Sequence, residues 1–266
     1  MKGGGRGHPK VSGVLPIALG SATKVIGLLM LSNKEYVAIM QLHKPVNEKR
    51  LREVVSEFIG RIYQKPPVRS SVKRVLRIKE VYNIEILEID YPYVLMRISC
   101  QHGTYVRKLI HDIGDVLGVG AHMRELRRVK TGPFKEDETL ITLHQLSEAL
   151  YVYKELKDDS LLRKAILPIE YAVSHLPKIA VLDGAVGALT HGADLAVPGI
   201  AMIHEGIRKG DTVAIFTLKG ELVAIGQALM HSEQVVEVSK GIAVKIKRVI
   251  MPRGAYPRQW KKKQLK

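Results

Sequence analysis

The sequence predicts an α+β protein that carries a second, smaller β-rich unit, and three observations support this. In the first part of the chain, some segments repeat apolar residues at helical spacing and others alternate apolar with polar residues. Beyond about residue 179, short apolar runs are separated by glycines at regular intervals, which is typical of strands joined by tight turns. The 266 residues, 46% of them apolar, are enough for two domains with separate cores.

Residues 36–100 alternate between strand and helix signals. Strands are predicted from apolar runs and alternation over 36–42, 81–89 and 94–100. Between the first two lies an amphipathic helix with Asn47 near its N-cap, because apolar residues recur there at spacings of three and four. Its apolar face is formed by Leu51, Val54, Val55 and Phe58. Pro66-Pro67 then marks a loop, since prolines lack the backbone donor and hold φ fixed.

Two more helices precede the β-rich unit. One is predicted over 105–117, with Gly118 as its C-terminal cap. The other opens with Thr142 and Gln145 as a capping box, and its spacing predicts three inward residues, Leu146, Leu150 and Tyr153. The resulting division is a catalytic-size domain over 1–170, a β-rich domain over 171–252 and a basic tail over 253–266.

The charge balance indicates a polyanionic partner. There are 42 Lys and Arg residues against 26 Asp and Glu residues, a formal net charge of +16 at pH 7, and no aspartate precedes Asp90. Nucleic acid is the favoured partner, with a basic proteome or a ribosomal-type surface as the alternative. The single cysteine, Cys100, excludes an intramolecular disulfide and indicates a reducing, cytoplasmic compartment. Lys24 interrupts the longest apolar stretch, so no membrane span is expected.

Five motifs carry residue types suited to chemistry on a nucleic acid. In chain order they are His8-Pro9-Lys10-Val11-Ser12-Gly13, Lys34-Glu35-Tyr36, Gly103-Thr104-Tyr105-Val106-Arg107, the stretch 118–128, and Thr190-His191-Gly192-Ala193-Asp194. A tyrosine suits a base pocket, because its ring stacks on a base while its hydroxyl reaches a polar edge. Arg107 falls at a predicted helix start, where the macrodipole disfavours a cation by about 0.3–1 kcal/mol. A cation kept there is better explained by a facing anion than by chance.

These motifs, in this order, resemble those of the TruB/dyskerin pseudouridine synthases, and the archaeal dyskerin-like branch fits better than the bacterial one. The resemblance implies the pseudouridine synthase fold, a mixed, mostly antiparallel sheet with flanking helices and a central cleft, followed by a small PUA β-barrel. It implies isomerisation of uridine to pseudouridine in tRNA, at guide-directed rRNA sites, or both. Neither a cofactor nor a metal is implied. The implied partners are tRNA, or H/ACA guide RNA with its rRNA substrate, and small H/ACA proteins.

The same resemblance implies roles for individual residues. His8 occupies the position of the nucleophilic aspartate, Tyr36 lies against the target base, Arg107 pairs with the nucleophile, and Leu126 forms the apolar wall of the uracil pocket. The basic loop 64–77 corresponds to the thumb loop that folds over RNA. The residues expected to bind RNA are Lys10, Arg69, Lys73, Arg74, Arg77, Tyr105, Arg127, Arg128, His191 and Gly192.

The departure at His8 leaves two hypotheses of different class. One is a pseudouridine synthase whose sequence start is altered or incomplete, because the run before His8 lacks the Thr-Leu-Asp that the family carries and a first strand and helix are missing. The other is an RNA-binding scaffold that keeps the platform without the chemistry. Retention of Tyr36, Arg107 and Leu126 favours the enzyme, since a scaffold does not need a uracil pocket. Asp90 and Asp112 match no catalytic position, and a translation-associated PUA protein is a weaker third reading.

Overall fold

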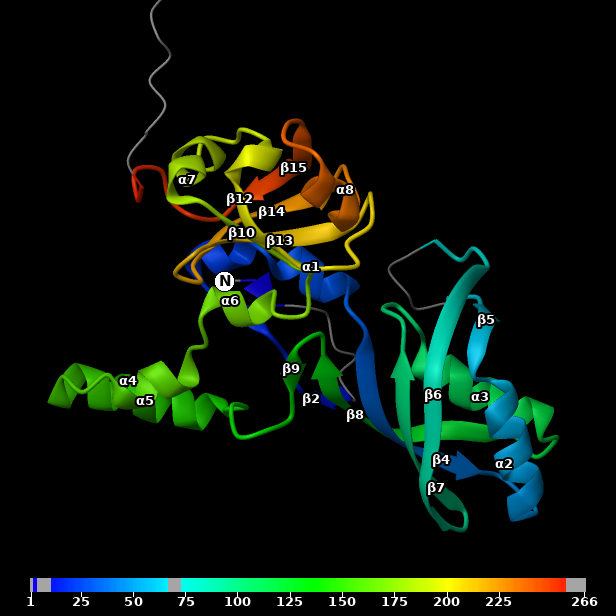
Figure 1. Ribbon diagram of the computed structural model, residues 1–266. Coiled ribbons are helices and arrows are strands. Elements are labelled where there is room, and N and C mark those ends of the chain that lie inside the picture. Colours follow the sequence, from blue (N-terminus) through cyan, green and yellow to red (C-terminus); the bar gives the residue numbers. More distant parts are fainter. Residues whose placement is uncertain (1, 4–10, 67–72, 257–266) are drawn as a thin grey trace, which may run out of the picture. The chain divides into compact units, whose positions relative to one another are not determined.

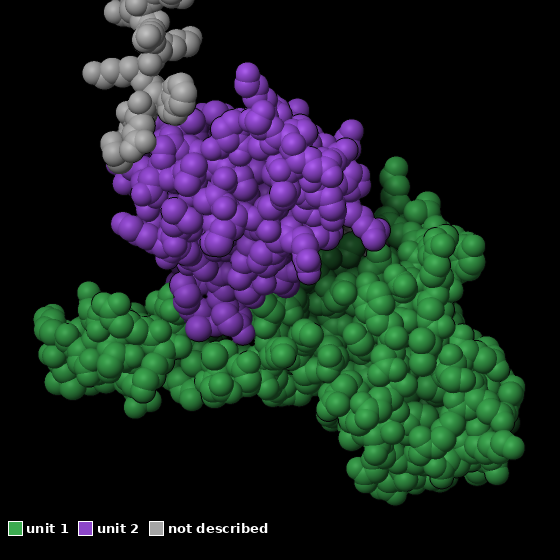
Figure 2. Space-filling view, in the orientation of Figure 1, with its two compact units in different colours: residues 1–18, 26–166 green, residues 19–25, 167–266 purple. Residues whose placement is uncertain are grey.

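A computed structural model describes residues 2–3, 11–66 and 73–256. The chain divides into two compact units, the first formed by residues 1–18 and 26–166 and the second by residues 19–25 and 167–266 (Figure 2). Among the described residues, none of the helices has both the length and the apolar character needed to cross a membrane. Each unit is built on its own sheet and has its own core.

A seven-stranded sheet is the frame of the first unit (Figure 1). Its neighbour order is β2, β8, β4, β7, β6, β5, with β9 paired to β8. The strands are β2 (Val11–Gly13), β4 (Lys34–Leu42), β5 (Gly60–Gln64), β6 (Arg77–Asp90), β7 (Tyr93–Cys100), β8 (Ala121–Thr131) and β9 (Phe134–Lys135). Only the pair β2 and β8 is parallel among these described strands. Two short strands, β1 (Lys2–Gly3) and β3 (Ile17–Ala18), pair separately.

Helices cover one face of this sheet. The helices of the first unit are α1 (Ile26–Leu31), α2 (Glu48–Glu57), α3 (Val106–Val116), α4 (Leu143–Leu156) and α5 (Ser160–Ala165). The apolar faces of α2 and α3 pack on alternate residues of the central strands, where Met40, Met96 and Ile98 are fully buried. Burying one such side chain contributes about 1.5–3 kcal/mol, so this layer is the main source of the unit's stability.

The predicted helix starts are confirmed, and one predicted packing face is wrong. The Asn47 side chain accepts hydrogen bonds from the Lys49 and Arg50 amides at 2.9 and 3.4 Å, and Thr142 with Gln145 forms the expected capping box. On α4, however, Leu150 and Tyr153 are 42% and 47% exposed. The reason is that α4 packs along α5 (Figure 1), which buries its small Ala149.

A six-stranded sheet is the frame of the second unit, as the glycine-punctuated runs predict. Its order is β11, β15, β14, β13, β10, β12, with β10 and β13 parallel. The strands are β10 (Lys178–Val181), β11 (Leu195–Ala196), β12 (Ile200–Ile203), β13 (Thr212–Thr217), β14 (Leu222–Ala228) and β15 (Ile242–Val249). The helices are α6 (Ile169–Ala172), α7 (Asp183–Leu189) and α8 (Ser232–Glu237), with 3₁₀ turns η1 (Gly20–Lys24) and η2 (Val197–Gly199).

A short segment from early in the sequence belongs to this second unit. Lys24 Nζ donates to Val249 O at 3.0 Å, and Arg248 Nη1 donates to Lys24 O at 3.0 Å. These two bonds attach η1 to the end of β15. The division at residue 170 predicted from the sequence does not anticipate this exchange, because its contacts join residues more than two hundred positions apart.

Candidate active site

The first motif continues into the edge strand β2. Its residues pair in parallel with β8, Val11 beside Leu126 and Gly13 beside Arg128. Gly13 has φ +95°, and a Cβ there would lie 2.2 Å from the Arg128 carbonyl oxygen, so only glycine fits. The sequence also assigns roles to His8, Lys10 and Arg69, which lie outside the described residues.

Tyr36 lies in the middle of the sheet, on the face that carries the core. Its neighbours across the sheet are Ile98 on β7 and Arg128 on β8. Burial is the largest influence on its hydroxyl and raises the pKa of Tyr36, and Cys100 raises it further. The charge of Arg128 and a side-chain hydrogen bond from it act in the opposite direction and lower that pKa. The phenol is therefore neutral at pH 7, with a cation beside it.

Lys34 is buried two residues before Tyr36 and faces the same side. Its side chain closes the end of α1: Nζ donates to Leu29 O at 2.7 Å, Met30 O at 3.1 Å and Ser32 O at 2.6 Å. Desolvation lowers the pKa of Lys34 to about 8, with a further lowering from Arg128. The sequence places Lys34 in the Lys34-Glu35-Tyr36 motif but does not indicate its structural role. Its partners lie only two to five residues earlier in the chain, but they are main-chain carbonyls, which no residue type marks in the sequence.

Arg107 falls in the first turn of α3, as the sequence predicts. The helix begins after Tyr105, whose main chain is clamped by Gln64 from the end of β5. The Tyr105 amide donates to Gln64 Oε1 at 2.9 Å, and Gln64 Nε2 donates to Tyr105 O at 3.2 Å. Gln64 is 2% exposed, so these two bonds replace water for both groups. The clamp joins the root of the basic loop to the helix start that presents Arg107, and sequence reasoning missed it.

Leu126, Arg127 and Arg128 follow one another along β8 and alternate between the two faces of the sheet. Leu126 is 9% exposed in the core that also contains Val106 and borders Tyr36. Arg127 points to the opposite face, where it forms an ion pair with Glu136. Leu126 and Tyr36 thus lie on the same face of the sheet and border the same core.

The position of Arg128 does not fit the phosphate contact that the sequence predicts for it. It is only 9% exposed, and its Nε donates to Val14 O at 2.7 Å. A side chain that tracks phosphates must reach solvent, which Arg128 does not. Arg127 is half exposed and fits that expectation better.

The described part of the basic loop keeps its charges exposed. Lys73, Arg74 and Arg77 are all exposed, and Arg74 Nε donates to Pro66 O at 3.3 Å, which joins the two sides of the loop. In the second unit, His191 and Gly192 follow α7 and are exposed; His191 Nδ1 lies 2.8 Å from Gly187 O, and Gly192 has φ +89°. RNA binding by these residues stays a prediction.

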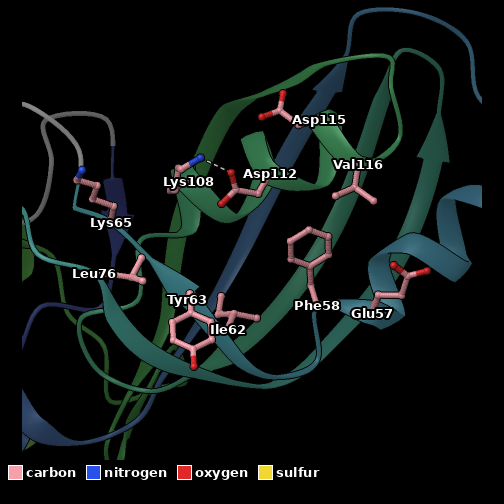
Figure 3. Close-up of a pocket in the computed structure, with 10 residues that line it drawn as sticks. All are labelled: Glu57, Phe58, Ile62, Tyr63, Lys65, Leu76, Lys108, Asp112, Asp115 and Val116. Carbon is pink, nitrogen blue, oxygen red and sulfur yellow. Dashed lines mark hydrogen bonds and ion pairs between the residues drawn. The ribbon is translucent and has the colours of Figure 1, made fainter.

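A groove of about 580 Å³ lies beside the loop root, apart from the motif residues just described (Figure 3). Its floor is apolar, and charged side chains stand around it. The lining residues are Glu57, Phe58, Ile62, Tyr63, Lys65, Leu76, Lys108, Asp112, Asp115 and Val116. Among the described residues, none of Tyr36, Arg107 and Leu126 lines it. We therefore separate this groove from the candidate active site.

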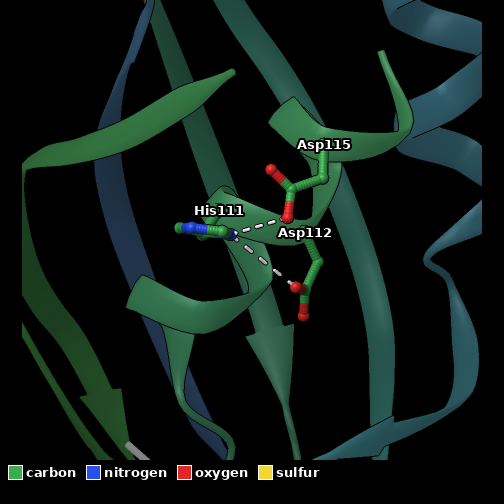
Figure 4. A group of neighbouring side chains, drawn as sticks. All are labelled: His111, Asp112 and Asp115. Carbon is green, nitrogen blue, oxygen red and sulfur yellow. Dashed lines mark ion pairs between the residues drawn. The ribbon is translucent and has the colours of Figure 1, made fainter. Parts of the chain in front are cut away.

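A polar cluster on α3 borders that groove. His111 Nδ1 lies 2.9 Å from Asp115 Oδ2 and 3.9 Å from Asp112 Oδ1 (Figure 4). The ligand atoms of these three residues all lie within 4.8 Å of one another. Lys108 pairs with Asp112, and His111 and Asp115 are more than half exposed. The cluster is accounted for by surface ion pairs on one helix face, each worth well under about 1 kcal/mol.

Sequence profiles divide the chain among three described domains. The TruB family pseudouridylate synthase N-terminal domain matches residues 4–106, and the tRNA pseudouridylate synthase B C-terminal domain matches residues 107–174. The PUA domain matches residues 177–250. The "Probable tRNA pseudouridine synthase B" of Pyrococcus furiosus is 57% identical over 260 residues, which are 98% of this chain and 76% of that protein.

Solved structures agree over the whole fold. A Cbf5-Nop10-Gar1 complex contains a chain that matches with a TM-score of 0.92 and 58% identity, covering 96% of this chain and 78% of that one. A chain in an H/ACA RNP bound to a substrate RNA containing 2'-deoxyuridine matches with a TM-score of 0.91 and 55% identity, covering 97% and 78%. The fold implied by the sequence motifs is confirmed. The chain belongs to the TruB family of pseudouridine synthases and carries a C-terminal PUA domain.

Proposed function

We propose that this protein isomerises uridine to pseudouridine in RNA. The observation that carries the proposal is the convergence of separate motifs on one core: Tyr36 from β4, Leu126 from β8 and the start of α3, which bears Arg107. The target base must leave its stack to reach such a pocket. In the reaction the C1′–N1 bond breaks, the base rotates, and a C5–C1′ bond forms while C5 loses a proton and N1 gains one. This isomerisation is not a redox reaction, and its bond changes balance without a cofactor.

Each residue has a task in this proposal. The residue at position 8 supplies the nucleophile where it is an aspartate, Arg107 pairs with that anion, Tyr36 stacks on the base and Leu126 walls the pocket. The exposed Lys73, Arg74, Arg77 and Arg127, with Tyr105, hold the RNA, and we keep Lys10 and Arg69 in the same role. His191 and Gly192 contact RNA from the PUA domain. The working division is 1–170 for the catalytic domain, 171–252 for the PUA domain and 253–266 for the tail.

The targets are inferred from the relatives. Similarity to tRNA pseudouridine synthase B supports tRNA as a target, and similarity to chains in the Cbf5-Nop10-Gar1 complex and in the RNA-bound H/ACA RNP supports assembly with guide RNA and with small proteins such as Nop10 and Gar1. The only cysteine of the chain, Cys100, is buried and free, which fits a reducing cytoplasm. An RNA-binding scaffold is the second candidate, and the observation that favours it is histidine at position 8.

Incubation with tritium-labelled RNA tests the function. A tRNA transcript and a guide RNA with its substrate, both labelled with [5-³H]uridine, are each given to the chain and to its His8→Asp variant. Pseudouridine formation releases the label from C5, and we expect release from at least one RNA by the variant. Binding without release by either protein would support the scaffold instead.

The basic loop is expected to set the salt dependence of RNA binding. Replacing Lys73, Arg74 and Arg77 with glutamine removes three exposed charges, so the slope of log K against log salt becomes shallower by about 2. Fluorescence anisotropy between 50 and 300 mM KCl measures it. The matched control replaces Lys154, Lys157 and Lys164 with glutamine, which removes the same charge from α4, its C-cap and α5. An equal loss of slope in both variants would show a general charge effect and contradict a role for the loop.

A further inference from the structure

We propose that Arg128 is a positioning residue, which holds Tyr36 and the segment after the catalytic loop in fixed relation to each other. The effect of Arg128 on the reaction rests on the proposed function. The contacts of Arg128 do not depend on that function. The consecutive arginines of β8 then have different tasks: Arg127 faces outward and Arg128 inward.

The first contact of Arg128 is a double hydrogen bond to Val14. The Val14 amide donates to Arg128 O at 2.8 Å, and Arg128 Nε donates to Val14 O at 2.7 Å. One residue thus satisfies both main-chain groups of Val14, directly after the strand β2. Gly13 allows this close approach, because any Cβ at that position would collide with the same Arg128 carbonyl. The segment that leads out of the first motif is therefore fixed to β8 through Arg128.

The second contact of Arg128 is with Tyr36. The two residues are register partners on β8 and β4, so their side chains leave neighbouring strands at the same level, and Arg128 lowers the pKa of the Tyr36 hydroxyl. Their pairing lies at an irregularity of the β4–β8 ladder, between Glu35 and Tyr36. Val14 directly follows β2 and Tyr36 lies on β4, and these two strands do not pair with each other, since β8 lies between them. Arg128, on the intervening strand β8, thus links Val14 to Tyr36.

The environment of Arg128 indicates a cation held in the protein interior, not one on the surface. Within the described part of the chain, none of the ion pairs involves Arg128. A buried guanidinium without a carboxylate is costly, because desolvation is not repaid by a full opposite charge. A fixed cation in a water-poor site stabilises negative charge that develops beside it. The Tyr36 oxygen is the neighbour on which such charge can develop.

The other ionisable groups around Tyr36 do not replace Arg128. Cys100 lies on β7 opposite Lys34 and is fully buried, and burial raises the pKa of that thiol to about 11. The thiol is therefore neutral at pH 7. Lys34 lies on the same strand, and its ammonium is bound to three carbonyl oxygens at the end of α1. Arg128 is the cation that pairs with Tyr36 in register and lowers the pKa of its hydroxyl.

Titration of Tyr36 in Arg128→Gln tests the proposal without any turnover. The protein is labelled with [ζ-¹³C]tyrosine, and Tyr36→Phe assigns the signal among the 10 tyrosines. We expect Arg128→Gln to raise the pKa of Tyr36 by about one unit, because it loses a neighbouring cation. Arg124→Gln is the control, since it removes an exposed arginine from the same strand. Arg128→Lys keeps a cation and is expected to move the pKa less than Arg128→Gln, which also provides a folded variant should glutamine not be tolerated.

RNA binding and turnover separate positioning from phosphate contact. Positioning predicts unchanged RNA affinity and salt slope in Arg128→Gln, and in a His8→Asp background a kcat at least about tenfold lower at unchanged KM. A salt slope shallower by about one, with an unmoved Tyr36 pKa, would restore the phosphate contact and overturn the proposal. A shifted pKa with no pseudouridine formed by any variant would refute the proposed function and leave the role of Arg128 in the fold intact.

Discussion

Replacing His8 with aspartate is expected to raise the rate of pseudouridine formation by at least about a thousandfold. Loss of an attacking group typically costs an enzyme several orders of magnitude in kcat, so restoring one recovers a similar factor. An aspartate is anionic at pH 7 without a separate base and pairs with a facing arginine. A protonated histidine would be repelled by Arg107, and a neutral one cannot form the ion pair. Single-turnover release of tritium from [5-³H]uridine RNA measures the rate.

His8→Asn is the matched control for this prediction. It has nearly the shape of aspartate but no charge, so it is expected to remain as slow as the unmodified chain. All three proteins should bind RNA equally, because they share all 42 Lys and Arg residues. A chain with histidine that reacts as fast as His8→Asp would show that no carboxylate is needed at this position.

Elements set by local chemistry could be predicted from the sequence. Asn47 and Thr142 mark helix starts because their side chains bond amides two or three residues later, and that pattern is visible in the sequence. The strands over 36–42 and 94–100 follow from alternation that the burial confirms. The motifs from Gly13 to Gly192 also identified the family, because they occur in the family's order.

Elements set by distant partners could not be predicted. Gln64 acts through the Tyr105 main chain, 41 positions away, and Lys24 through β15, 225 positions away. A polar side chain that caps a distant peptide leaves no periodic signal. The exposed face of α4 has the same origin, since helical spacing identifies an apolar stripe without identifying which element covers it.

The inward direction of Arg128 follows from the alternation of side chains along β8. Leu126 was expected inside the pocket, and residues two apart on a strand share a face. Arg128 therefore had to point inward with Leu126, while Arg127 pointed outward. Two adjacent arginines suggest phosphate binding if only their charge is considered. On a strand, however, adjacent side chains point to opposite faces, so one arginine lies at the surface and the other in the interior.

Lys34 is expected to make the stability of the first unit rise with pH between about 7 and 9.5. The pKa of Lys34 is lowered to about 8 in the folded protein, whereas an unfolded lysine titrates near 10.4. In this window the unfolded chain binds more protons than the folded one, so raising the pH favours folding. Below pH 8 both states are charged and the cost of the buried ammonium is present in full. The gain over the window is about 2 kcal/mol.

Comparison with Lys34→Met isolates this contribution. Methionine keeps the buried volume and cannot titrate, so the difference in unfolding free energy between the two proteins should move by about 2 kcal/mol in favour of lysine as pH rises. Cys100 has the opposite effect on stability. Its pKa is raised to about 11 in the folded protein, so as the pH rises the thiol ionises first in the unfolded chain, and the folded protein becomes less stable. Because the charge of Lys34 lowers the pKa of Cys100, both proteins carry Cys100→Ala, which removes the thiol from the comparison. Urea unfolding at constant ionic strength measures it, and a difference that stays level with pH would mean that the ammonium at the end of α1 is already stabilised by its three carbonyls.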